Sequence, residues 1–306
     1  MKTLPVRLPP AVLLGLGLAL GLASAPRVGA QEGGAQDLSR SYLAVSLTET
    51  PRAQTDSLGG EYGSFGGFVA ASFPLQQGPR FRLYGGLRFG ADAADFDFLK
   101  EKRTLYSAHA SLSAWVRAGE KDSLVFSLSP GFAEDEHTLS NPRLRFSGAA
   151  LGTRRSSPTL FLEYGLIYSY VYGRGRLLPV FGVRWQPEPG WVVSALLPVS
   201  VRVRRRVGPT ASVGLLAAPM GERVRFQNAG EFPGQPSTVN LRLRQYRIAA
   251  EAVFRAGRQA TLSLEAGALV ARKISFANND DDFVESSLKS APYGRLSVRL
   301  NFGAQP

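Results

Sequence analysis

The sequence predicts an all-β protein, a transmembrane antiparallel up-and-down β-barrel of about 12 strands (range about 10–14) that follows a cleaved signal peptide. Three observations lead to this fold class: a secretory signal at the N-terminus, strands with one apolar and one polar face, and connections that alternate between long and short. Successive side chains of a strand point to opposite faces, so a sheet between lipid and water needs this alternation.

The composition fits this fold and excludes several others. The chain has 306 residues, 44% of them apolar, with 33 Gly, no Cys and a net charge of +12. The missing Cys excludes disulfides and thiol catalysis. Beyond the N-terminus, no charge-free apolar run reaches the ~18 residues that a membrane-spanning helix needs.

The N-terminus has the layout of a secretory signal. Lys2 and Arg7 precede Ala11–Ala25, a charge-free segment rich in Leu, Gly and Ala, and small residues follow at the cleavage positions. We expect cleavage after Ala30, with an uncleaved anchor as the alternative, and a mature protein in the bacterial outer membrane of a Gram-negative envelope. The expected organisation is a signal peptide (1–30), a short polar leader (31–36) and an outer-membrane β-barrel (37–306).

The last strand shows the two-faced pattern most clearly. Leu296, Val298, Leu300 and Phe302 alternate with polar residues. We expect this apolar face to meet lipid, and the strand to close the barrel against the first one. The predicted strands are Arg40–Glu49, Tyr62–Phe73, Phe81–Gly90, Thr104–Ala118, Ser123–Ala133, Pro158–Tyr172, Leu178–Gln186, Trp191–Arg204, Thr210–Ala217, Val239–Arg255, Ala260–Ala271 and Tyr293–Phe302.

One predicted strand, Val239–Arg255, changes phase along its length. Leu241 and Leu243 share one parity, whereas Tyr246 and the apolar residues after it take the other. A bulge near Gln245 would explain the change, and so would an upper part that stands clear of the membrane.

The connections sort by length, as they do in outer-membrane barrels with short periplasmic turns and longer extracellular loops. If the first strand ascends from the periplasm, the predicted extracellular connections are 50–61, 91–103, 134–157, 187–190, 218–238 and roughly 272–291. The predicted periplasmic connections are 74–80, 119–122, 173–177, 205–209 and 256–259. All of the first set except 187–190 are long and all of the second set are short, which a soluble β-sandwich would not require.

Many arginines lie on the polar faces of these strands. Because an arginine on the lipid face costs roughly 2–4 kcal/mol at the midplane, we expect them to face the lumen. They could lower the barrier for anions in an open pore, or fill a narrow lumen in pairs with acidic residues. The predicted lumen-facing basic residues are Arg82, Arg88, Arg117, Arg202, Arg204, Arg242, Arg244, Arg247, Arg295 and Arg299, and the predicted acidic partners are Glu163, Glu251 and Glu265.

Four aromatic residues are predicted to lie at the membrane interfaces. Trp185 and Trp191 are expected at the extracellular strand ends, and Trp115 and Phe302 near the periplasmic ends. Aromatic girdles of this kind flank the apolar band of membrane barrels.

His109 and Ser111 are the catalytic candidates. Their i, i+2 spacing places both on one face of a strand, where the imidazole could act as base for the hydroxyl. The pair resembles the His-x-Ser pair of outer-membrane lipid A deacylases, which implies a Glu further along. Glu120 is near that distance but falls in a predicted turn. We expect a lumen-facing, hydrogen-bonding His and no enzyme activity.

Two acidic loops invite a metal interpretation. His137 follows an acidic triplet, and Asp280 to Asp282 follow two Asn residues. Neither has the Gly and Glu of a defined calcium loop, so we expect solvated loops and no metal or cofactor. A signal peptide and alternating strands also argue against nucleic acid as a partner.

The stretch Leu178–Arg204 resembles a known family. Leu178-Pro179 leads through Trp185 and Pro187 to Trp191 and then Leu197-Pro198, a hairpin of the form "LP … W.P … W … LP". This is similar to the middle of an uncharacterised family of bacterial outer-membrane β-barrel proteins that is known only as a domain of unknown function. The resemblance implies an outer-membrane barrel and supplies no activity, ligand or catalytic residue.

The sequence therefore favours an outer-membrane barrel of unknown specific role. It predicts either a small passive pore with an arginine-rich lumen or a structural barrel. A lipid-modifying outer-membrane hydrolase using His109 and Ser111 is one alternative, and a secreted soluble β-protein is another. The expected partners are outer-membrane lipid, small anions and, as the barrel class implies, the barrel-insertion machinery during assembly.

Overall fold

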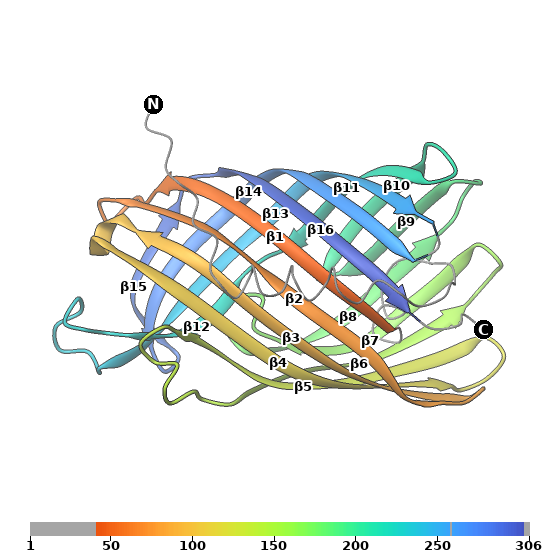
Figure 1. Cartoon of the computed structure of the whole chain (residues 1–306), viewed down its shortest axis with the longest axis horizontal. Helices are drawn as coiled ribbons and strands as arrows, with labels where there is room; N and C mark the ends of the chain where they lie inside the picture. Colours follow the sequence, from red (N-terminus) through yellow and green to blue (C-terminus); the bar gives the residue numbers. More distant parts are fainter. Residues whose placement is uncertain (1–40, 258, 303–306) are drawn as a thin grey trace.

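The strands of the chain form a tilted, closed β-barrel (Figure 1). The computed structural model describes residues 41–257 and 259–302. The predicted signal peptide and polar leader (1–36), and the four residues after Phe302, lie outside this part. Within it, no helix is long and apolar enough to cross a membrane.

The strands vary in length from six to 19 residues. Their bounds are β1 Ser41–Gln54, β2 Glu61–Gln77, β3 Phe81–Phe96, β4 Glu101–Arg117, β5 Asp122–Asp135, β6 Arg145–Arg155, β7 Leu160–Ser169, β8 Arg176–Trp185, β9 Trp191–Leu197, β10 Ser200–Arg206, β11 Ala211–Pro219, β12 Glu222–Gln227, β13 Thr238–Ala256, β14 Ala260–Asn278, β15 Asp281–Leu288 and β16 Ala291–Phe302. The 3₁₀ helix η2, Asp97–Leu99, lies between β3 and β4.

Fourteen strands close the wall in the part of the chain that the structure describes. These are β1 to β11 with β13, β14 and β16, and every neighbouring pair is antiparallel. Closure is made by β1 and β16, with Leu43 opposite Leu300 and Leu47 opposite Leu296. The predicted pairing of the last strand with the first is therefore confirmed.

The outer face of the wall is apolar. Leu87 and Leu215, for example, are exposed by 59% and 65%, and the last strand presents Leu296 and Val298 on the same face. Exposed side chains of this size on nearly every strand form a continuous belt, whereas a soluble protein rarely exposes a large apolar patch. The two-faced pattern of the sequence thus corresponds to an apolar outer face and a polar inner one.

The two ends of the barrel differ. We call the end where β1 begins and β16 finishes the terminal end, and the opposite one, where β12 and β15 lie, the distal end (right and left in Figure 1). At the distal end β12 continues the path of β11 along β13, and β15 pairs with the upper part of β14. Arg225 of β12 then forms a bridge to Glu134 of β5, and Thr55 after β1 forms one to Leu288 of β15.

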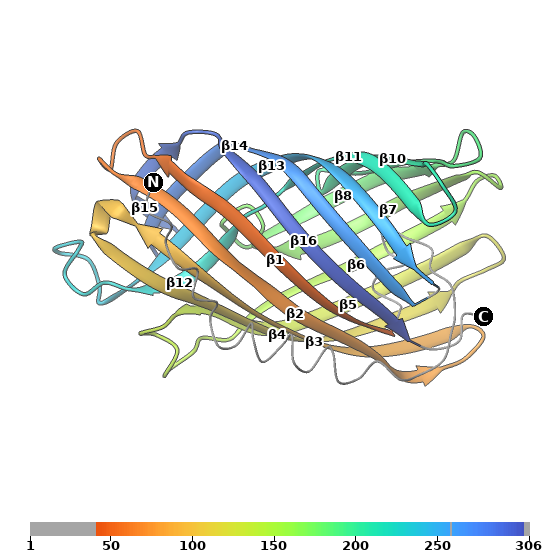
Figure 2. The same cartoon turned by 45° about the horizontal axis from the view of Figure 1, so that its top comes forward.

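These bridges close a second, narrower ring of nine strands, β1 to β5 and β12 to β15, which we call the distal cap. Its interior is a packed apolar core around Phe96, Phe226 and Phe276, none of which has any exposed surface. Phe226 contacts Phe96 and Phe276 in edge-on geometry, at ring-centroid distances of 5.6 and 5.4 Å. Strands β6 to β10 end before they reach the distal cap, as Figure 2 shows from a second direction.

The predicted count of about 12 strands is too low because two features were missed. The predicted loop 134–157 contains β6, and the predicted strand Trp191–Arg204 is two strands joined by a turn at Pro198 and Val199. Because β6 was missed, the next two connections were assigned to the wrong ends of the barrel. The loop 170–175 lies at the distal end and the turn 186–190 lies at the terminal end. The missed turn between β9 and β10 reverses the strand direction once more, so the connections after it lie at the ends predicted for them.

Candidate functional site

Most of the predicted lumen arginines lie on the inner face of the wall. The strand register places their side chains on the same face of the sheet as the buried Ser46 and Ser113. The exposed apolar belt is on the other face. They are Arg82, Arg88, Arg117, Arg202, Arg204, Arg247, Arg295 and Arg299. Arg88 faces inward yet is solvent-exposed, with its guanidinium 3.9 Å from the ring centre of Phe68. The lumen at this level therefore admits water.

Arg242 and Arg244 do not face the lumen, contrary to the prediction. The register of β13 against β14 shifts between Arg244 and Tyr246, so Gln245 is the bulge that the sequence suggested. Beyond it Leu241 and Leu243 point into the apolar core of the cap and the arginines point outward. Arg242 is buried there, bound to the carbonyl oxygens of Asn279 and Asp280 and to the carboxylate of Asp282.

The inner face also holds arginines that the sequence analysis did not select. Arg184 on β8 and Arg206 on β10 continue the inward parity of their strands, and Arg145 and Arg255 do so at the ends of β6 and β13. Alternation within β8 was sufficient to assign Arg184, whereas Arg206 fell in the predicted connection 205–209 because the strand was expected to end at Arg204. Arg145 lay in the missed strand, so no signal pointed to it.

The predicted acidic partners neutralise part of this charge. Glu251, which is buried, lies 2.9 Å from the guanidinium of Arg204 and 3.4 Å from that of Arg202. Glu265 accepts hydrogen bonds from Arg247 at 3.2 Å and from the hydroxyl of Tyr293 at 2.9 Å.

The third predicted partner, Glu163 on β7, is also buried inside the wall. It faces inward two residues along β7 from Phe161, which lies opposite Arg184. Guanidinium groups still outnumber carboxylates on the inner face.

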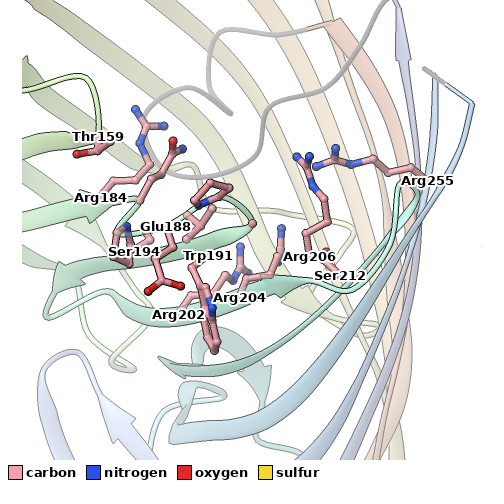
Figure 3. A pocket seen from close by; sticks show the side chains of 15 residues that line it. Thr159, Arg184, Glu188, Trp191, Ser194, Arg202, Arg204, Arg206, Ser212 and Arg255 are labelled. Carbon is pink, nitrogen blue, oxygen red and sulfur yellow. The ribbon is translucent and has the colours of Figure 1, made fainter.

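On the inner face at the terminal end lies a cavity of about 420 Å³, which we call the terminal vestibule (Figure 3). Arginines from β8, β10 and the end of β13 line it together with the turn between β8 and β9. The lining includes Arg184, Arg202, Arg204, Arg206, Arg255, Glu188, Trp191, Thr159, Ser194 and Ser212. Figure 3 shows the guanidinium groups of Arg206 and Arg255 side by side.

His109 faces the lumen beside an arginine. Its Nε2 lies 3.4 Å from the guanidinium of Arg145, which is bound in turn to Glu222 at 2.7 Å. A nearby cation disfavours the protonated imidazole that base catalysis must form. Among the described residues no hydrogen bond joins His109 to Ser111, and Glu120 lies in the turn at the terminal end.

The three tryptophans predicted at the interfaces are placed differently from the prediction, whereas Phe302 lies on the outer parity at the terminal end. Trp115 faces the lumen, where the guanidinium of Arg82 lies 5.0 Å from its ring centre. Trp185 and Trp191 are on the outer parity at the terminal end, not at the opposite end from Phe302 as predicted. Trp185 and Trp191 were assigned to the wrong end because β6 was missed, which reversed the predicted direction of strands β8 and β9.

The acidic loops hold arginines instead of a metal site. Asp282 binds Arg174 and Arg242, and Asp280 lies 3.2 Å from Arg242. His137 lies 3.6 Å from Glu136 at an exposed position. Within residues 41–302, Arg258 aside, no group of three or more His, Asp or Glu side chains is arranged to hold a metal ion.

Comparison with solved structures finds an outer membrane channel, an autotransporter translocator domain and a toluene transporter, all at low sequence identity. The outer membrane channel COG4313 from Pseudomonas putida F1 is 12% identical, with 92% of this chain and 100% of that one covered, and a TM-score of 0.46. The translocator domain of the autotransporter NalP from Neisseria meningitidis is 13% identical, with 96% of each chain covered and a TM-score of 0.41. The toluene transporter TodX of Pseudomonas putida is 10% identical, with 86% and 90% covered and a TM-score of 0.36.

Comparison of the sequence gives the family. No curated protein matches the chain. A family model described as "Domain of unknown function (DUF6268)" matches residues 103–303, which include the hairpin β8–β9 on which the resemblance rested. The chain therefore belongs to this family of unknown function, as the hairpin motif indicated.

Proposed function

We propose that the protein is a β-barrel of the bacterial outer membrane that conducts small anions when its distal cap opens. The observation that carries the proposal is the inner face of the fourteen-strand wall, where the guanidinium groups of the described residues outnumber the carboxylates and Arg88 is solvent-exposed. Positive charge lining a pore lowers the barrier for anions and raises it for cations. The apolar outer belt supports a lipid environment.

The cap explains why conduction must be gated. A path along the barrel axis would cross the core around Phe96, Phe226 and Phe276, which is dry and closely packed. An ion cannot enter such a core without a large desolvation cost. In the part of the chain that the structure describes, the lumen is therefore blocked at the distal end in this conformation.

The seam between β5 and β12 is where the cap has least backbone pairing. A single bridge, between Glu134 and Arg225, joins the two strands. The other single bridge of the cap, Thr55 to Leu288, is flanked by backbone hydrogen bonds from Asp56 to Ser287 and from Lys289 to Gln54. Side chains replace the missing ladder. Asp135 accepts hydrogen bonds from the backbone N–H of Gln227 at 2.9 Å and from Arg103 at 2.7 Å. Loosening this seam would separate the cap wall sideways.

Planar-bilayer recording of the refolded full chain tests the proposal. We expect rare openings in the wild type, more frequent ones in Asp135→Asn, and a reversal potential in a KCl gradient that favours Cl⁻. Asp95→Asn, on the same rim but in an exposed ion pair with Arg52, serves as the matched control. Cation preference would refute the anion pathway, and silence of both wild type and Asp135→Asn would leave a purely structural barrel.

Localisation and the absence of catalysis belong to the same proposal. A membrane-inserted barrel migrates faster on a gel before heating than after, whereas a secreted soluble β-protein would be released without detergent. Lipid turnover in cells carrying His109→Ala should equal that of wild type, because Arg145 faces the imidazole. A loss of lipid turnover in this variant would revive the hydrolase alternative.

A further inference from the structure

The terminal vestibule has the features of a ligand site as well as those of a pore entrance. We infer that it binds a small organic molecule carrying two anionic groups, either carboxylates or phosphates. The inference deepens the proposed function, since the bound molecule would be the conducted solute. Its volume of about 420 Å³ lies within the usual range of small-molecule sites and exceeds the needs of a single inorganic ion.

The spacing of the arginines indicates more than one anionic group. Arg202, Arg204 and Arg206 alternate along β10 and all face inward. Residues two apart on a strand are separated by roughly 7 Å, so this row spans about 13 Å of the wall. Arg184 from β8 faces the same cavity across β9, with Arg202 opposite Ser194 and Ser194 opposite Arg184.

The two ends of the row differ in their neighbouring side chains. Arg202 and Arg204 share the buried carboxylate of Glu251. Beyond them, the guanidinium groups of Arg206 and Arg255 lie side by side (Figure 3). Each guanidinium carries five N–H donors in a planar fork that fits a carboxylate or phosphate in two-point contact. Such a pair can hold one anionic group from both sides.

Arg184 provides the second anchor. Its side chain is buried, 5% exposed, and its guanidinium lies 4.5 Å from the ring centre of Phe161. The Nε atom is out of contact with solvent and has no hydrogen-bond partner among the residues that the structure describes. A buried donor left unsatisfied is costly, and it gains a partner when an anion binds beside it.

The rest of the lining suits the body of such a molecule. Thr159, Ser194 and Ser212 offer hydroxyl groups, and Pro187 and Pro189 of the turn between β8 and β9 offer apolar surface. Glu188 contributes a carboxylate to the lining, which disfavours ligands carrying more negative charge than the arginines can match.

Isothermal titration of the refolded full chain in detergent at ~0.15 M salt tests the inference. Inorganic pyrophosphate and citrate are the probes for phosphate and carboxylate recognition, and spermidine is the cationic control. We expect saturable binding of at least one anion and none of spermidine. Arg206→Gln and Arg184→Gln should each weaken binding about tenfold, as expected for one charge-assisted contact.

Arg205→Gln is the matched control, because Arg205 follows the same strand but points outward over the ring of Trp191. It should leave affinity unchanged, and heat-modifiable migration should show that all variants are folded. Absence of saturable anion binding, or equal losses in Arg205→Gln and Arg206→Gln, would overturn the inference. Binding without conduction would refute the proposed channel alone, and conduction without binding would refute only the vestibule as a ligand site.

Discussion

Replacing Asp135 with Asn should open the distal cap locally while leaving the barrel wall folded. The carboxylate of Asp135 has no exposed surface and accepts hydrogen bonds from Arg103, from the backbone N–H of Gln227, and from the N–H and hydroxyl of Thr138. Arg103, also buried, keeps Glu101 and Glu231 as partners. The substitution preserves size and removes the negative charge.

The expected magnitude follows from these contacts. Removing one partner of a buried ion pair typically costs 3–5 kcal/mol, because a charge is left without compensation. Since two carboxylates remain on Arg103, we expect the lower limit, about 3 kcal/mol. A change of this size raises the population of the open seam by about 150-fold, at ~1.4 kcal/mol for each factor of ten.

Limited proteolysis of the loops beside the seam, 136–144 and 228–237, measures that population when reclosing is faster than cleavage. We expect cleavage there to accelerate by about two orders of magnitude in Asp135→Asn. In Asp95→Asn it should change little, because that carboxylate pairs with the exposed side chains of Arg52 and Lys102. Equal cleavage rates in the two variants would refute the role of Asp135 at the seam.

Two further predictions concern the wall and the acid limit of the cap. Leu264→Arg, on the exposed face of β14, should lower the free energy of unfolding of the refolded barrel in lipid by roughly 2–4 kcal/mol. Ser263→Arg, at the neighbouring position that faces the lumen, should lower it much less. Equal losses of stability in urea unfolding would contradict the assignment of faces. In the cap, burial would raise the pKa of Asp282, but the hydrogen bond from Arg174 and the charge of Arg242 outweigh it and lower that pKa. The stabilisation of the cap by ionised Asp282 is therefore complete above the ordinary Asp pKa of about 3.9, and it is lost as the pH falls through the lowered pKa. Cleavage of the cap by pepsin should therefore rise below about pH 4 in wild type and depend less on pH in Asp282→Asn.

The strands that the sequence predicted correctly are those with strong contrast between faces. Leu296, Val298 and Leu300 give β16 its direction and its partner, and the phase change at Gln245 located the bulge in β13. Strand β6 was missed because its outward positions include Gly148, Ala150 and Gly152, which give no apolar signal. Space explains the last of these, since a Cβ on Gly152 would lie 2.6 Å from the ring of Tyr164.

The turn between β9 and β10 was hidden for the opposite reason. Val193, Ala195 and Leu197 continue the same alternation as Val201 and Val203 across Pro198, so periodicity alone reads one strand where the structure has two. The arginines of the vestibule could be assigned to one face from sequence, but not to one cavity. Their convergence depends on β8, β10 and the end of β13 meeting inside a curved wall, which is a property of the closed barrel.

One step in the topology accounts for both the dry cap and the wet lumen. Strands β6 to β10 end early, so nine strands continue above them where fourteen close the wall below. A barrel of about eight strands is just narrow enough for side chains to fill its interior, and a wider one leaves room for water. The narrow ring is therefore packed with Phe side chains and the wide one is lined with Arg. Two of these short strands, β8 and β10, also carry Arg184, Arg202, Arg204 and Arg206. The strands whose early end allows the cap to form therefore also supply the proposed anion-binding surface of the wider ring.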